Sequence, residues 1–428
     1  EPYRRQRQMC IRDRLQILKD YSTDFFERIK GIDRITLILV AILFGIGLIM
    51  VYSITSISIY NGVKGDPSNL FIKTLIMGIA GIIAMLCVIA IPYRTLKRLS
   101  PLAVIGCPFL LVITLLFARG SESSEVRSWF RIGSFKLQPA EFVKIGMIMA
   151  VAWLVDYRVR KGTYYLKTCK GINWSITWQS FIFVICYIGL CTGLVLIQPD
   201  FGSALIIGFI GLIMFLSTGV KWKAFKPIFY FGVCLLVIGF IIMSKVFPYQ
   251  LERFAVWKDP FNHAKGFQNV MGYTAIALGG MTGVGVGNST QKYGYVLEPH
   301  NDMISTILAE ELGVWMILVV MVIYFFIAMR CFFTAIKCKE LYGSIASIGI
   351  GAIFLVQPLI NLGGASGAFP LTGVTLPFIS YGGSSLVSLF IGIGIYLNIS
   401  MERAAKEKKL KEKKQHDLKM KVVPFPKA

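Results

Sequence analysis

Long apolar windows, separated by short polar segments, recur along almost the whole chain. They lie near residues 35–54, 70–91, 102–117, 140–155, 178–197, 203–218, 226–247, 303–328, 344–361 and 384–400. A helix needs about 20 predominantly apolar residues to cross a bilayer, and most of these windows are close to that length. The pattern predicts an all-α integral membrane protein with about ten transmembrane helices.

Basic residues gather in every second segment between these windows. Counted from a cytoplasmic N-terminus, the inside segments hold Arg94, Lys97 and Arg98; Arg158, Arg160, Lys161, Lys167 and Lys170; Lys221, Lys223 and Lys226; and Arg330, Lys337 and Lys339. Because segments rich in Lys and Arg stay in the cytoplasm, we expect both termini there. The expected parts are an N-terminal segment at 1–34, a ten-span membrane domain at 35–400 and a basic cytoplasmic tail at 401–428.

Composition supports a membrane protein and changes the interpretation of the charge. The 428 residues are 55% hydrophobic and 16% charged, with a mean hydropathy of +0.65, which is more apolar than a soluble domain requires. A net charge of +22 suggests nucleic acid at first, but the charge lies in loops and termini, so anionic membrane lipid is the expected partner, not nucleic acid. The nine cysteines show no metal-binding spacing. Residues 1–14 resemble a translated adapter sequence and are expected to be non-native.

Three segments are expected outside the cell: 118–139, 248–302 and 362–383. The first carries four cations on the side where few are expected, so either this is tolerated or an anionic ligand binds there: Arg119, Arg127, Arg131 and Lys136. The long second segment, with Gly283, Gly285 and Gly287, is expected to re-enter the membrane or to pack tightly. The third, dense in Pro, Gly and hydroxyl groups, is a candidate pocket wall.

Charged groups inside the apolar windows are candidates for function. Glu141 and Lys144 share a helix face at i and i+3, which favours a structural ion pair; Lys144 can alternatively face a cavity and bind phosphate. Asp200 is either a helix N-cap or a substrate-binding residue. Glu310 and Glu311 are adjacent, so we expect only one of them to face the bundle interior.

Asp302 is the most informative of these groups, because it lies where the chain re-enters the membrane. A carboxylate at that boundary is costly to dehydrate and is usually retained for a function. Partial desolvation would raise its pKa and suit it to act as a general base. The alternative is an N-cap for the following helix. The nearby His300 is by itself an ordinary loop histidine.

Several motifs occur together and in order: Arg127-Ser-Trp129-Phe, Gln138-Pro-Ala-Glu141-Phe-Val-Lys144, Gln198-Pro-Asp200-Phe-Gly202, Arg253-Phe, Asp259-Pro260, Gly266-Phe-Gln268, Pro299-His-Asn-Asp302, Glu310-Glu311-Leu-Gly313, and Pro370-Leu-Thr-Gly373 through Ser384. On these motifs the chain, from about Ile35 to Ile399, resembles the SEDS family of peptidoglycan polymerases. Residues 283–293 and the last motif look more like the FtsW branch, from low-GC Gram-positive bacteria, than the RodA branch.

The resemblance implies a peptidoglycan glycosyltransferase at the outer face of the bacterial cytoplasmic membrane, at the division septum. It would polymerise lipid II, the undecaprenyl-pyrophosphate disaccharide-pentapeptide, with Asp302 as the general base. The substrate-binding residues implied are Arg127, Trp129, Lys144, Gln198, Asp200, Arg253, Gln268, His300, Ser380 and Ser384. It also implies a class B penicillin-binding protein and other division proteins as partners, and allows a divalent cation, Mg²⁺ or Mn²⁺. A lipid II flippase and a non-catalytic division scaffold are the alternatives.

Overall fold

A computed structural model describes residues 28–56, 68–121, 124–132, 135–160, 174–219, 248–296 and 299–421. The expected non-native residues 1–14 and the predicted span at 226–247 lie outside these ranges. The described chain is mostly helical. Its long helices are α2 Arg34–Thr55, α3 Ser68–Ala90, α4 Tyr93–Phe117, α5 Pro139–Arg160, α6 Trp174–Ile197, α7 Phe201–Ser217, α11 Ile304–Lys337, α12 Leu341–Ala365 and α13 Gly383–Lys421. Every predicted window except 226–247 therefore coincides with a helix.

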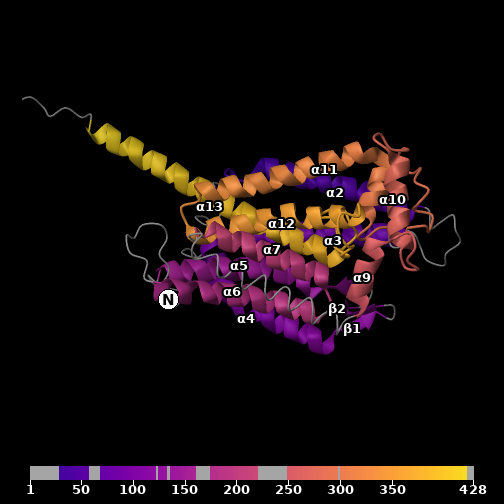
Figure 1. Ribbon diagram of the computed structural model, residues 1–428. Helices are drawn as coiled ribbons and strands as arrows, with labels where there is room; N and C mark the ends of the chain where they lie inside the picture. Colours follow the sequence, from indigo (N-terminus) through magenta and orange to yellow (C-terminus); the bar gives the residue numbers. More distant parts are fainter. Residues whose placement is uncertain are drawn as a thin grey trace, which may run out of the picture.

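Within the described residues, six helices are long and apolar enough to cross a membrane: α2, α3, α4, α11, α12 and α13. They run side by side with α5, α6 and α7 in one elongated bundle (Figure 1). At most a third of the apolar window is buried in α2, α3, α4 and α11, whereas α12 and α13 are buried over most of theirs. The outward faces carry large apolar side chains such as Ile38 and Ile105, which suits contact with lipid.

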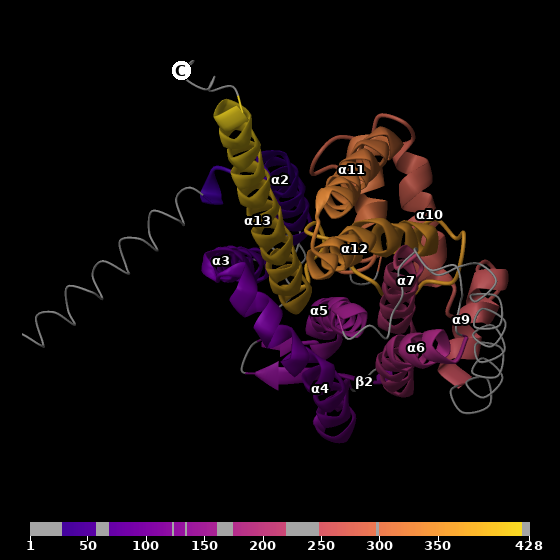
Figure 2. The same cartoon turned by 90° about the vertical axis from the view of Figure 1, so that its left-hand side faces the viewer.

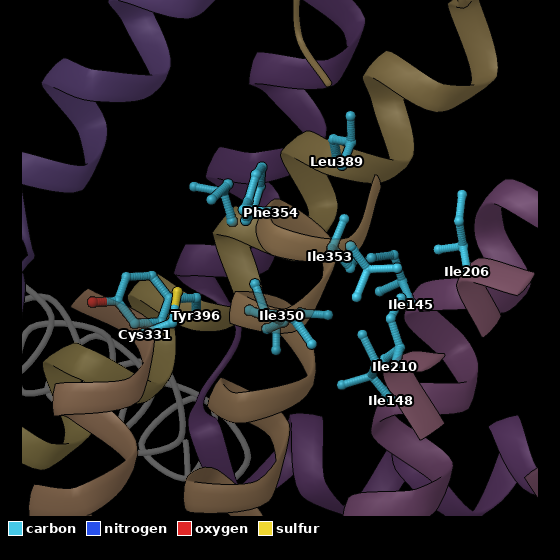
Figure 3. Packing of buried hydrophobic residues seen from close by; sticks show 14 of the residues in the cluster. Ile145, Ile148, Ile206, Ile210, Cys331, Ile350, Ile353, Phe354, Leu389 and Tyr396 are labelled. Atoms are coloured by element: carbon cyan, nitrogen blue, oxygen red, sulfur yellow. The ribbon is translucent and has the colours of Figure 1, made fainter. Parts of the chain in front are cut away.

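Helix α12 lies in the middle of the bundle, where Figure 2 shows it between α11 on one side and α5 and α7 on the other. Its Ile350, Ile353 and Phe354 pack against residues of α5, α7 and α13, as Figure 3 shows. The close approach of α5 requires a small residue, because a Cβ on Gly349 would lie 2.7 Å from Ile148. Near its C-terminal end, this central helix reaches the segment around Asp302 through Asn361.

A small sheet, which the sequence analysis did not predict, covers part of one end of the bundle. It consists of β1 Arg119–Ser121, β2 Ser124–Ile132 and β3 Phe135–Leu137, all antiparallel, in the order β1-β2-β3. Two short helices, α9 Pro248–Lys258 and α10 Phe267–Gly279, lie at the same end (Figure 1). The segments expected outside the membrane are thus folded structures gathered at one end.

The glycine-rich segment after α10 packs directly against α11, where that helix is interrupted at Gly313 (φ 83°). Val284 N donates to the Glu310 carbonyl at 2.9 Å, and Gly285 N donates to the Glu311 carbonyl at 2.9 Å. A Cβ on Gly283 would lie 2.3 Å from the Glu311 carbonyl oxygen, so no larger residue fits without a shift of the backbone. The expectation of tight packing is confirmed at Gly283, whereas a Cβ on Gly287 would have no atom within 4 Å, and that glycine instead has a positive φ of 88°.

Candidate active site

Asp302 lies in the turn that precedes α11, at the end of the bundle that carries α9 and α10. It is partly buried. Helix α11 begins at Ile304, its N-cap residue is Met303, and the cap makes no side-chain hydrogen bond. The alternative that Asp302 is the N-cap of this helix is therefore wrong.

Asn361, near the C-terminal end of α12, holds the backbone of Asp302 in place. Its side-chain nitrogen donates one hydrogen bond to the Asp302 carbonyl at 2.8 Å and another to the Val374 carbonyl at 2.7 Å. Both hydrogens of the amide are thus used, and the buried Asn361 ties the turn before α11 to the segment after α12. The sequence analysis missed this residue; an amide within an apolar helix was the available signal.

Arg253 lies close to the Asp302 carboxylate and is held from α9. A Cβ built on Gly373 would lie 3.9 Å from Arg253 Nη2 and 4.0 Å from Asp302 Oδ2, so both charged groups reach the same small space. Arg253 Nη1 also donates to the Leu371 carbonyl at 3.0 Å. Position 373 has a φ of 75°, which favours glycine. The absence of a side chain there leaves room between the Arg253 guanidinium and the Asp302 carboxylate.

The segment between α12 and α13 closes over this turn. Tyr381 N donates to the His300 carbonyl at 2.8 Å, and the two side-chain rings meet edge to face with centroids 5.6 Å apart. Ser380 Oγ accepts from Leu376 N at 2.7 Å and so shapes the segment internally. The structure therefore brings His300 and Ser380 to the neighbourhood of Asp302, with Ser380 engaged in a turn.

Asp200 is the N-cap of α7, where its carboxylate accepts from Ser203 N at 3.0 Å. Gln138 Nε2 also donates to Asp200 Oδ2 at 2.6 Å, and Gln138 N donates to Ser384 Oγ at 3.3 Å. The capping alternative for Asp200 is confirmed. A Cβ on Gly202 would lie 2.7 Å from the Thr372 carbonyl, so this cluster touches the segment that carries Gly373.

Gln198, two residues before Asp200, is fully buried, and its Nε2 donates to the Leu111 carbonyl of α4 at 2.9 Å. Gln268 lies at the start of α10 and is partly buried. Trp129 lies in β2 opposite Arg119 and is partly buried. Arg127 lies in the same strand, and its side chain is outside the described part of the structure.

Glu141 and Lys144 form an ion pair in α5, with Lys144 Nζ 2.8 Å from Glu141 Oε2. The side chain of Lys144 is only 2% exposed, and its ammonium also donates to Gln357 Oε1 at 3.0 Å. Gln357 Nε2 in turn donates to the Thr375 carbonyl at 2.9 Å. Through Gln357, the ion pair thereby helps to hold Thr375 in place. The preceding residue, Val374, is held by Asn361.

Glu310 and Glu311 are both buried, which corrects the expectation that only one of them faces the interior. Glu310 accepts from Ser289 Oγ at 2.5 Å and from Thr290 N at 2.8 Å. Glu311 meets Lys292 Nζ at 2.6 Å, and both of these side chains are fully buried. Two neighbouring acids can both face inward because the 289–292 segment wraps around the helix and supplies a partner to each. The sequence analysis did not single out Lys292.

Among the residues that the structure describes, no group of three or more His, Cys, Asp or Glu side chains is arranged to hold a metal ion. Mg²⁺ is commonly bound through one or two carboxylates together with substrate phosphates. Asp302 is a carboxylate of the kind that could hold such an ion together with the substrate pyrophosphate.

Replacement of Asn361 by leucine should reduce activity through the position of Asp302. The apolar side chain leaves the Asp302 and Val374 carbonyls without their donors, at a cost of about 1–3 kcal/mol. If Asp302 is the expected general base, turnover should fall about tenfold to a hundredfold, because a small displacement of a catalytic group is costly. Turnover by the purified variant, measured beside its thermal unfolding midpoint, checks this.

The control is Asn361→Asp, which is similar in shape but supplies no N–H donors. If loss of the two hydrogen bonds is the cause, the leucine and aspartate variants will both lose activity. Full activity in the aspartate variant would show that Asn361 is needed only to fill space.

Comparison with known proteins identifies the family. Residues 34–405 match the family model for cell cycle proteins of the FtsW/RodA/SpoVE type. The chain is 37% identical over 403 residues to the probable peptidoglycan glycosyltransferase FtsW of Bacillus subtilis, covering 90% of this chain and 94% of the relative. It is 32% identical over 373 residues to the stage V sporulation protein E of the same organism, covering 86% and 96%.

Solved structures share the fold. A chain from a peptidoglycan synthase complex that coordinates polymerization and crosslinking aligns with a TM-score of 0.69 at 25% identity, over 87% of this chain and 98% of that one. The RodA protein of Thermus thermophilus aligns with a TM-score of 0.61 at 23% identity, over 87% and 97%. The resemblance inferred from the motifs is confirmed: the chain belongs to the FtsW/RodA/SpoVE family of cell cycle proteins.

Proposed function

We propose that this chain is a peptidoglycan glycosyltransferase of cell division and that Asp302 is its general base. The observation that carries the proposal is a partly buried carboxylate beside Arg253, at one end of a bundle of membrane-spanning helices. Relatives of high coverage are named as peptidoglycan glycosyltransferases, which supports the same activity here. A carboxylate near the surface but partly dehydrated is suited to accept a proton.

The proposed substrate is lipid II, and the proposed step is glycosyl transfer with inversion. The 4-hydroxyl oxygen of the acceptor GlcNAc attacks C1 of the donor sugar from the face opposite the pyrophosphate. The C1–O4 bond forms, the bond between C1 and the pyrophosphate oxygen breaks, and its electron pair leaves with the lipid pyrophosphate. Asp302 takes the hydroxyl proton as the oxygen attacks, so no positive charge accumulates on that oxygen.

Charge that develops on the leaving pyrophosphate requires cations nearby. Arg253 is placed for this, because its guanidinium and the Asp302 carboxylate reach the same space. Arg119, Arg127, Arg131 and Lys136 belong to the sheet at this end of the bundle and are further candidates. Gln268, partly buried at the start of α10, is a proposed substrate-binding residue. Lys144, Gln198 and Asp200 are bonded within the protein, so their proposed role is to support the site and not to contact the substrate. A divalent cation, when bound, would neutralise pyrophosphate charge as a Lewis acid.

The proposed topology has ten spans with both termini in the cytoplasm, which places Asp302 on the outer side. The basic segments at 94–98, 158–170 and 330–339 support this orientation through the positive-inside rule. The proposed location is the bacterial cytoplasmic membrane at the division septum. A class B penicillin-binding protein is the proposed partner, since the related complex combines polymerization with crosslinking.

Purified chain in proteoliposomes with labelled lipid II tests the function against its alternatives. We expect glycan strands to form when the penicillin-binding protein partner is added, and few or none with Asp302→Ala. A flippase would move lipid II across the bilayer without strand synthesis, and Asp302→Ala would leave that movement intact. A scaffold would do neither.

A further inference from the structure

A cavity lined by charged side chains lies at the end of the bundle opposite Asp302. It has a volume of about 450 Å³ and is lined by the start of α4, the end of α5 and Glu340 between α11 and α12. Asp302, by contrast, accepts a hydrogen bond at its carbonyl from Asn361, near the C-terminal end of α12. Helix α12 has 25 residues and is therefore about 37 Å long, enough to cross the hydrocarbon core. The cavity and Asp302 therefore belong to opposite leaflets.

Four cations line this cavity against two carboxylates, Asp156 and Glu340. Lys97 Nζ lies 2.9 Å from Asp156 Oδ2 and 3.8 Å from Glu340 Oε2. Arg160 Nη2 lies 2.7 Å from Asp156 Oδ2, and Glu340 also pairs with Lys406. Both carboxylates are thus already neutralised by cations of the chain itself.

Arg94 and Arg98 are the two remaining cations. They are exposed, and their i, i+4 spacing on α4 places them on one face of that helix. Within the described ranges, no carboxylate lies at ion-pair distance from either of them. Like charges at this spacing repel each other, and an anion between them would remove the repulsion.

Aromatic side chains indicate the level of the membrane at which the cavity lies. Trp153 and Tyr157, also one turn apart on α5, line it with their rings stacked at a centroid distance of 4.9 Å. Trp and Tyr are enriched where a membrane meets water, so this end lies at the level of lipid headgroups. On α4 the adjoining turns carry Leu102 and Ile105, which are 67% and 76% exposed and suit contact with acyl chains.

We propose that this cavity binds the phosphate headgroup of an anionic phospholipid in the leaflet opposite Asp302. Arg94 and Arg98 contact the phosphate, Trp153 and Tyr157 lie at the level of the glycerol, and the acyl chains follow α4. Basic pockets between membrane helices bind anionic headgroups in this way. With a cytoplasmic N-terminus, the leaflet is the inner one.

The test uses the full-length chain in detergent, titrated with short-chain phosphatidylglycerol and, separately, with phosphatidylcholine, with bound lipid counted by native mass spectrometry. Wild type should bind phosphatidylglycerol in preference to phosphatidylcholine. The double variant Arg94→Gln/Arg98→Gln should bind phosphatidylglycerol on the order of 30-fold more weakly, from two lost charge contacts. The matched control Lys409→Gln/Lys413→Gln removes the same charge from the exposed end of α13 and should leave the affinity unchanged.

Equal affinity of the wild type and the Arg94/Arg98 variant would overturn the proposal, as would equal binding of the two lipids by wild type. A third titration, with inorganic phosphate alone, separates the two sources of a phosphate group. Binding of phosphate as tight as that of phosphatidylglycerol would assign the site to a soluble anion and overturn the lipid assignment.

Discussion

Replacement of Asp302 by asparagine should lower the rate of glycan-strand synthesis about a hundredfold to ten-thousandfold, the range attributed to a positioned general base. Asparagine keeps the shape of the side chain and the backbone hydrogen bond from Asn361, but it cannot take the acceptor proton. Substrate binding should change little, because the loss falls on the transition state. Single-turnover assays with labelled lipid II, with the partner present, measure this directly.

The matched control is Glu252→Gln, which also converts a carboxylate to an amide at the same end of the bundle. Glu252 of α9 forms an ion pair with Lys265 at 2.7 Å, and the side chain of Lys265 is 66% exposed. Because exposed ion pairs contribute little, this change should cost little stability or activity. A second variant, Asp302→Glu, keeps the carboxylate but moves it, and should recover part of the rate. An Asp302→Asn enzyme that retains more than a tenth of wild-type activity would remove the carboxylate from the mechanism.

Replacement of Lys292 by methionine should destabilise the protein strongly. The side chains of Lys292 and Glu311 are fully buried, and the Lys292 ammonium also donates to Ser53 Oγ of α2 at 2.9 Å. Breaking a buried ion pair leaves an uncompensated charge, at a cost of about 3–5 kcal/mol. A markedly lower thermal unfolding midpoint in detergent is the expected measurement.

The double variant Lys292→Met/Glu311→Leu separates the net contribution of the ion pair to stability from the cost of leaving the Glu311 carboxylate unpaired. Removing both charges should restore most of the stability, because a buried ion pair exchanged for apolar side chains is often close to neutral. Lys265→Met, which breaks the exposed pair with Glu252, is the control and should shift the midpoint only slightly. If the double variant unfolds at a lower temperature than Lys292→Met, the argument fails.

Local pattern was enough for several elements of the site. The spacing of Glu141 and Lys144 places both on one helix face, and they meet at 2.8 Å, because helical geometry alone brings i and i+3 together. Asp200 directly precedes the first turn of α7, and it caps that helix. In each case the partner lies within one turn in the sequence, so no knowledge of the rest of the fold was needed.

Partners far apart in the sequence escaped prediction. Asn361 and Asp302 are 59 positions apart, and Ser53 and Glu311 are 258 positions apart. Nothing in either local pattern connects them, because contact depends on how the helices and the wrapped 280–292 segment pack. The sheet at 119–137 was missed for a related reason: short polar strands carry little periodic signal between two apolar windows.

The sequence by itself predicted a bundle of membrane helices, and the described long helices coincide with its apolar windows. It also predicted that Asp302 lies where the chain re-enters the membrane. These follow from apolar length and the cost of placing charge in lipid, which are properties of short stretches of chain. Only the tertiary structure decided that Arg253 lies near the Asp302 carboxylate and that Asn361 bonds the Asp302 carbonyl. It also decided that both Glu310 and Glu311 are buried, and that Arg94 and Arg98 line a separate cavity. Packing decides such contacts, because it brings together side chains whose distance along the chain says nothing about their distance in space.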